Sequence, residues 1–117
     1  MRAAAIALVL LAAVVGARAE GGGAPCATIE ACDAAIRTAP GLALYEARGY
    51  LHLMRRDLDN AIADFSAAIA IDGSRAFSLY GRGMARLISG DAAGQNEMEA
   101  AIMLQRDIAE EFKAYAK

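Results

Sequence analysis

The side chains of this chain that could take part in chemistry are few, and its two cysteines stand out among them. Cys26 and Cys32 are six residues apart. This spacing matches neither the CxxC motif of dithiol oxidoreductases nor the ligand pattern of a structural zinc site. An even number of thiols in an exported chain favours a disulfide bond. We therefore interpret the pair as a structural crosslink rather than a redox centre.

A disulfide between these cysteines constrains where the first helix begins. Within one helix, residues six apart lie about 9 Å apart along the axis and about 120° apart around it, which is beyond the reach of a disulfide. We expect the helix to begin after Cys26, with Thr28 as its N-cap and Pro25 just upstream. The alternative is that Cys32 is a small buried residue and Cys26 a free or intermolecularly paired thiol.

The remaining reactive side chains do not form a catalytic set. His52 is the single histidine of the sequence. Asp57, Asp59 and Asn60 begin like a calcium loop, but Ile62 occupies the position where an EF-hand requires glycine. The chain contains no nucleophile elbow, phosphate-binding glycine loop or HExxH motif. We expect a protein that is not an enzyme and that uses no cofactor and no metal.

The first nineteen residues have the composition of a secretory signal peptide. Arg2 supplies a short charged region, residues 3–15 are continuously apolar, and Ala17 and Ala19 are the small residues that a signal peptidase recognises. As a helix, this apolar run would extend about 20 Å, less than a hydrocarbon core of about 30 Å. We expect cleavage after Ala19, export to the periplasm or the medium, and no permanent membrane span. The glycine-rich residues 20–25 are expected to form a flexible leader.

The charge of the mature chain argues against a nucleic-acid partner. Removal of residues 1–19 takes away Arg2 and Arg18 but no acidic residue, so the formal charge moves from −2 to −4. Proteins that bind nucleic acid usually carry clustered lysines and arginines that displace counterions from the phosphates. The basic residues that remain here are scattered, so we expect no nucleic-acid binding.

The rest of the chain has the pattern of an all-helical domain. Apolar residues recur at helical spacing from Leu44 onward, and no segment shows the alternation of a half-buried strand. Turn-forming residues divide the sequence into segments of about 13 to about 16 residues. We expect the breaks between these segments at 40–41, 56–57, 72–74, 90–91 and 106–107.

The helical region also repeats itself along the chain. At an offset of 34, Tyr45, Arg48, Gly49, Arg56 and Asp57 align with Leu79, Arg82, Gly83, Gly90 and Asp91, and the later half of each unit repeats at an offset of 33. A period of this length with two helices in each unit is typical of solenoid proteins, whose units bury their apolar faces only by stacking.

Residues 43–50 and 57–65 resemble the tetratricopeptide repeat (TPR) family. Small residues at Gly49 and Ala61 would let paired helices approach closely, while Tyr45 and Phe65 fill the space that remains. The resemblance implies an all-α fold of antiparallel helix-turn-helix repeats, stacked as a short right-handed superhelix. It divides residues 26–117 into a half repeat at 26–40, a repeat at 42–75, a degenerate repeat at 76–106 and a capping helix at 107–117.

The capping helix has an apolar face and a polar one. Ile108, Phe112 and Tyr115 share the apolar face, since they are spaced i, i+4 and i+7. We expect Asp107 to be the N-cap of this helix, and Glu110, Glu111 and Lys117 to face outward.

Three polar residues occupy positions where the TPR pattern places packing residues. Arg48 and Arg82 share one repeat position, and we expect each to pair with an acid such as Asp64 or Glu99 rather than with a ligand. His52 replaces an aromatic residue of the family, and we expect it to be a partly buried structural imidazole.

The resemblance also implies a concave groove lined by the first helix of each unit. An apolar groove rich in aromatic and methionine side chains suits a helix or an extended peptide. The lysine and asparagine pair with which some family members hold a terminal carboxylate is missing. The alternatives are that the helix containing Phe112, or a second copy of the protein, covers the groove. The residues that the resemblance places in the groove are Glu46, Tyr50, Leu53, Met54, Phe77, Tyr80, Met84 and Ile88.

These observations lead to one main functional hypothesis and two alternatives. The main hypothesis is an exported, non-catalytic adaptor that binds a protein or peptide partner through the groove. The first alternative is a homo-oligomeric structural protein whose groove is used for self-packing. The second is a small-molecule carrier or hydrolase, which would need an enclosed pocket with converging polar groups.

Overall fold

A computed structural model describes residues 24–115 of the chain. The predicted signal peptide at 1–19, most of the predicted leader at 20–25, and Lys117 lie outside the described residues. The described part is all helical and contains no strand, which confirms the all-α part of the predicted fold class. Its helices are α2 (Ile29–Thr38), α3 (Leu42–Met54), α4 (Leu58–Ile71), α5 (Ala76–Ile88), α6 (Ala93–Leu104) and α7 (Ile108–Ala114).

The helix breaks fall where the turn-forming residues predict them. The helices α3, α4 and α5 have 13, 14 and 13 residues, within the expected range. The helices α2, α6 and α7 are shorter, with 10, 12 and 7 residues. At α2 the reason is local, because the Thr28 side chain accepts a hydrogen bond from the amide of Ala31 at 3.0 Å and so fixes the N-terminus of the helix. None of the helices among the described residues is both long and apolar enough to cross a bilayer.

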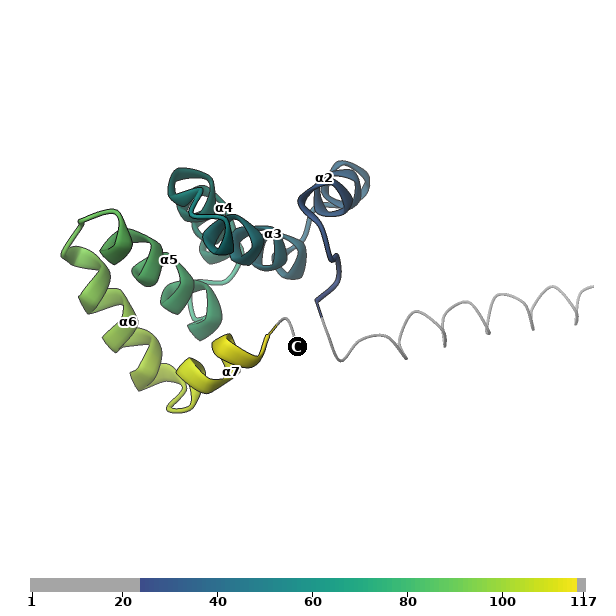
Figure 1. The fold of residues 1–117 in the computed structure, drawn as a ribbon. Helices are drawn as coiled ribbons and strands as arrows, with labels where there is room; N and C mark the ends of the chain where they lie inside the picture. Colours follow the sequence, from purple (N-terminus) through teal and green to yellow (C-terminus); the bar gives the residue numbers. More distant parts are fainter. Residues whose placement is uncertain (1–23, 116–117) are drawn as a thin grey trace, which may run out of the picture.

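Consecutive helices pack against one another along the chain (Figure 1). The helix α3 contacts α4, α4 contacts α5, and α5 contacts α6, while α2 packs on the free side of α3. The last helix, α7, turns back from α6 and packs on α5. The result is a row of helices with α7 lying across one of its faces.

Glycines allow the closest of these helix contacts. A Cβ atom on Gly83 would lie 2.7 Å from the carbonyl oxygen of Gly94, so the backbones of α5 and α6 touch at this pair. A Cβ atom on Gly49 or Gly81 would instead meet the ring of Phe65, which is itself fully buried. The packing role expected for Gly49 and Phe65 is therefore found in the structure.

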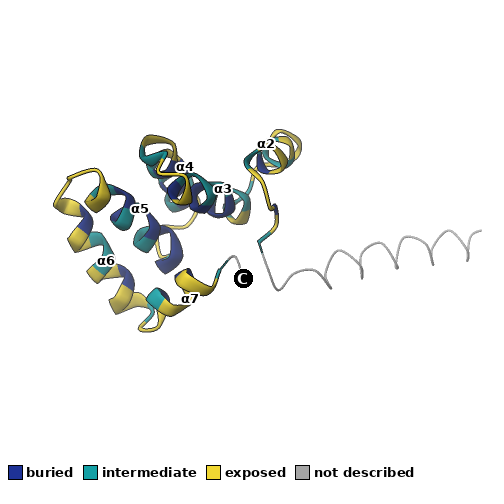
Figure 2. Cartoon of the chain, viewed as in Figure 1, coloured by how far each residue is buried: buried dark blue, intermediate teal, exposed yellow. Residues whose placement is uncertain are grey.

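The buried residues form two clusters, which Figure 2 shows in dark blue along the inner sides of the helices. The larger one runs through α3, α4, α5, α6 and α7 and includes the fully buried Leu53, Phe65 and Ile108. The smaller one consists of Cys26, Cys32 and Ala47, and it joins the N-terminal segment and α2 to α3. Burial of large apolar side chains, at about 1.5–3 kcal/mol each, is the main stabilising contribution in the larger cluster.

Candidate functional site

Cys26 and Cys32 form a disulfide bond, with their Cα atoms 5.2 Å apart. Cys26 precedes α2 and Cys32 lies within it, as the geometry of a helix requires. Both cysteines are buried, and the described part of the chain holds no free thiol. The alternative with a free Cys26 is therefore wrong, and these cysteines offer no nucleophile.

Arg48 is bound by carboxylates from two neighbouring helices. Its Nε and Nη2 atoms donate to the two carboxylate oxygens of Asp64 at 2.9 and 2.8 Å, and its Nη1 atom donates to Asp33 at 2.7 Å. These hydrogen bonds, chiefly those with Asp64, raise the pKa of Arg48 above its ordinary value. The predicted pairing of Arg48 with Asp64 is confirmed, and three of the five N–H donors of this guanidinium are used within the chain.

Arg82 occupies the same repeat position but pairs with a residue other than the one expected. Its Nε atom donates to Glu97 at 2.9 Å, and Arg86 binds the same carboxylate at 2.8 Å. Glu99 instead accepts a hydrogen bond from Gln95 on the exposed side of α6. The expectation of Glu99 is wrong because two residues rotate a helix by about 200°, which turns Glu99 away from α5.

His52 lies between two carboxylates and is mostly buried, with 13 % of its side chain exposed. Its Nδ1 atom is 3.4 Å from Asp57, and its Nε2 atom is 3.8 Å from Asp64. Asp57 is at the N-cap position of α4 without a capping hydrogen bond, and its carboxylate accepts from the Asn60 side chain at 2.8 Å. That hydrogen bond, together with the nearby imidazole, lowers the pKa of Asp57. Asp107 is likewise at the N-cap position of α7, and its side chain forms no capping bond.

Within residues 24–115, no three histidine, cysteine or carboxylate side chains converge as metal ligands would. The charged side chains described above are instead paired between helices. Paired charged groups of this kind fix how neighbouring helices sit against each other.

The eight residues predicted to line the groove lie in three different environments. Tyr50, Leu53 and Phe77 are buried in the main core, Tyr80 and Met84 are half-buried, and Met54 and Ile88 are exposed.

Glu46, the remaining predicted groove residue, is buried between α3 and α5. Its carboxylate accepts hydrogen bonds from Arg75 at 2.8 and 3.1 Å and from the Ser78 hydroxyl at 2.6 Å. Both oxygens are therefore used within the chain, and Glu46 is a structural residue in this fold.

The helix α7 lies across the aromatic part of this face. The ring of Phe112 is 4.6 Å from that of Phe77, 5.2 Å from that of Tyr50 and 5.3 Å from that of Tyr80, measured between centroids. Phe112 is only 3 % exposed. The spacing of Ile108, Phe112 and Tyr115 predicts such an apolar face, and in the structure that face covers three of the predicted groove residues, Tyr50, Phe77 and Tyr80.

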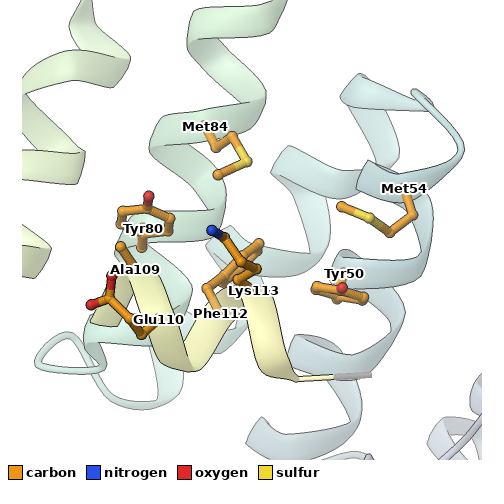
Figure 3. A pocket seen from close by; sticks show the side chains of 8 residues that line it. All are labelled: Tyr50, Met54, Tyr80, Met84, Ala109, Glu110, Phe112 and Lys113. Carbon is orange, nitrogen blue, oxygen red and sulfur yellow. The ribbon is translucent and has the colours of Figure 1, made fainter. Parts of the chain in front are cut away.

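A pocket of about 490 Å³ remains beside α7, between this helix and the facing sides of α3 and α5. Figure 3 shows Met54 and Tyr50 on one side, Met84 and Tyr80 on the other, and α7 across the space between them. The pocket lining is mostly apolar, and the charged Glu110 and Lys113 lie at its α7 edge. Four of the predicted groove residues therefore lie around one pocket.

The sequence left open whether the helix containing Phe112 covers the predicted groove residues, and in the structure α7 contributes to the pocket lining. Ala109, Glu110, Phe112 and Lys113 all line it. Glu110 is exposed, as expected, but it borders the pocket instead of facing away from it. The apolar spacing of α7 signalled that this helix packs on the domain, but it carried no information about which surface the helix covers.

Comparisons of this chain with protein-family models, with curated proteins and with solved structures gave no match.

Proposed function

We propose that this protein is an exported, non-catalytic interaction module that binds a segment of another protein in the pocket between α3, α5 and α7. The observation that carries the proposal is the pocket lining, in which two methionines and two tyrosines surround a space of about 490 Å³. Flexible thioethers adapt to the shape of a ligand, and tyrosines provide a large contact area with a polar tip. Such a surface suits the side chains of a peptide segment.

The arrangement of the helices as stacked TPR-like pairs, in a short right-handed superhelix, is part of this proposal. Arg48 of α3 pairs with Asp64 of α4, and Arg82 of α5 pairs with Glu97 of α6. The two arginines occupy equivalent positions of the sequence repeat, and so do the two acids. Equivalent ion pairs in successive helix pairs are what an internal repeat would produce.

The disulfide supports the localisation in the proposal. Disulfide bonds persist in oxidising compartments such as the periplasm and the medium, and they are rare in the cytosol. The Cys26–Cys32 bond is therefore in keeping with export after cleavage of residues 1–19.

Substitution at the pocket rim tests the proposal. We would capture partners from the exported fraction of the native cell with the wild-type protein and with a Met54→Lys/Met84→Lys double variant. Met54 is 48 % exposed and Met84 is half-buried, so the variant should remain folded, whereas a change at the buried Tyr50 would damage the core. Met103→Lys is the matched control, because Met103 is 89 % exposed on α6 and does not line the pocket.

Under the proposal, the same protein is captured by the wild type and by Met103→Lys, and it is lost with the double variant. If the double variant is folded and captures the same partners as the wild type, the pocket is not the binding site.

Self-association is a second candidate function, favoured by a separate surface. The end of α6 exposes three consecutive apolar residues, Ile102, Met103 and Leu104. Exposed apolar residues that are contiguous often mark an interface. Sedimentation velocity over a range of concentrations tests this candidate: the mass of the wild type should rise with concentration, and Met103→Lys should abolish the rise. A mass that stays at one chain throughout excludes it.

A further inference from the structure

The two ends of the described chain meet at one side chain. Tyr115, which follows the last residue of α7, packs against the small cluster of Cys26, Cys32 and Ala47. Tyr115 also packs against the main core. Its ring centroid lies 5.0 Å from that of Tyr50. Tyr115 therefore connects the disulfide-bonded N-terminal segment to the helix that covers the groove.

The helix α7 depends on such contacts for its position. It has seven residues, and isolated helices shorter than about 12 residues are marginal in water. Only three residues separate it from α6, and Ile108, Phe112 and Tyr115 pack in or against the main core. If Tyr115 lost its support, α7 would be held by two packing residues instead of three.

The N-terminal segment depends in turn on the disulfide. Residues 24–27 lie outside any helix, and the bond from Cys26 to Cys32 ties them to α2. Cys32 is fully buried and Cys26 is 8 % exposed, so the bond forms part of the packed cluster on which Tyr115 rests. A segment of four residues without regular structure has little else to fix its position.

We infer that the Cys26–Cys32 disulfide keeps α7 seated in the groove, so that reduction of this bond loosens α7 and uncovers the aromatic floor beneath it. The reductant is a dithiol. It transfers two electrons: the Sγ–Sγ bond breaks, Cys26 and Cys32 each become a protonated thiol, and the dithiol leaves as its own disulfide. The uncovered floor consists of Tyr50, Phe77 and Tyr80, which contact Phe112 in the seated state.

This inference extends the proposed function, because an uncovered floor would enlarge the binding surface beyond the pocket. The test of this inference requires no partner. The inference can therefore fail while the proposed function stands, and the proposed function can fail while the inference stands.

Amide hydrogen exchange of the protein, with and without dithiothreitol, tests the inference directly. We expect reduction to accelerate exchange in residues 108–114 by at least tenfold, while the amides of α4 near Phe65 keep their rates. If residues 108–114 exchange at the same rate in both states while α2 alone is accelerated, the disulfide does not hold α7 and the inference is wrong.

A reciprocal measurement, of the equilibrium between the disulfide and the dithiol forms, tests the inference a second time. Coupling between two sites is symmetric for equilibria, so release of α7 must make the disulfide easier to reduce. We expect Tyr115→Ala to shift the equilibrium constant for reduction by dithiothreitol at least threefold toward the thiols. Tyr115→Phe, which keeps the ring, should match the wild type. Equal equilibrium constants for all three proteins would overturn the inference.

Discussion

The contact between α5 and α6 offers a sharp test of the packing, through substitution of Gly94 by alanine. In a helix this change ordinarily stabilises by about 0.5–1 kcal/mol. Here the new Cβ atom would lie closer than 3.0 Å to the carbonyl oxygen of Gly83 and 2.8 Å from the amide nitrogen of Leu87. Both are backbone atoms of α5, so they can move only if the two helices separate.

The size of the effect follows from these opposing contributions. Overpacking in a well-packed core costs about 1–3 kcal/mol, and a backbone-to-backbone clash belongs in the upper part of that range. The gain in helix propensity is small because Gly94 is the second residue of α6. We therefore expect the free energy of unfolding to fall by about 2 kcal/mol, which lowers the Tm of a domain of this size by about 10 °C.

Urea denaturation followed by circular dichroism measures this change, with Gly73→Ala as the control. A Cβ atom on Gly73 would lie 3.7 Å from the carbonyl oxygen of Ile69, an ordinary contact. The control should be neutral or stabilising by about 0.5 kcal/mol, because alanine restricts the unfolded chain. A Gly94→Ala variant as stable as the wild type would show that α5 and α6 do not meet through these glycines.

Three further predictions concern charge and pH. Arg48→Met should lower the free energy of unfolding by about 3 kcal/mol in urea titrations, because it leaves the buried Asp64 carboxylate unpaired; a loss below about 1 kcal/mol would contradict this. Burial raises the pKa of Tyr115 from 10.0 to about 12, so between these pH values the phenol is protonated in the folded state and ionised in the unfolded state. The free energy of unfolding should therefore fall as the pH rises from 10 to 12. In thermal melts the Tyr115→Phe variant should lose less stability over this pH range than the wild type. An equal loss in the two proteins would show that Tyr115 does not cause it. Hydrogen bonds from Ser74 lower the pKa of Asp72 below 3.8, so the free energy of unfolding should fall as the pH drops through the folded-state pKa of this carboxyl. In acid titrations Asp72→Asn should show a smaller fall, and a fall equal to that of the wild type would contradict this prediction.

Local patterns in the sequence predict much of the fold. Pro40, Gly41 and Gly90 fall at helix breaks, since proline and glycine disfavour helix interiors. The spacing of Cys26 and Cys32 predicts that α2 begins after Cys26 if the two are bonded, because helix geometry admits the bond only when one cysteine precedes the helix, and the structure contains that bond.

The candidate site is predicted less completely. Tyr50, Met54, Tyr80 and Met84 line the pocket, as the TPR resemblance implies. Glu46 does not, because its carboxylate is bound by Arg75 and Ser78 on another part of the chain. The sequence places Glu46 on α3 but does not say which helix will face it.

The amino-acid sequence by itself determined the helices and their breaks, because these depend on residues within a few turns of one another. The tertiary structure decided that Glu46 is buried and that α7 lies across Tyr50, Phe77 and Tyr80, beside a remaining pocket. Those outcomes depend on contacts between helices that are distant in sequence. The periodicity of a helix shows which of its faces is apolar, but it does not show which other helix will pack on that face.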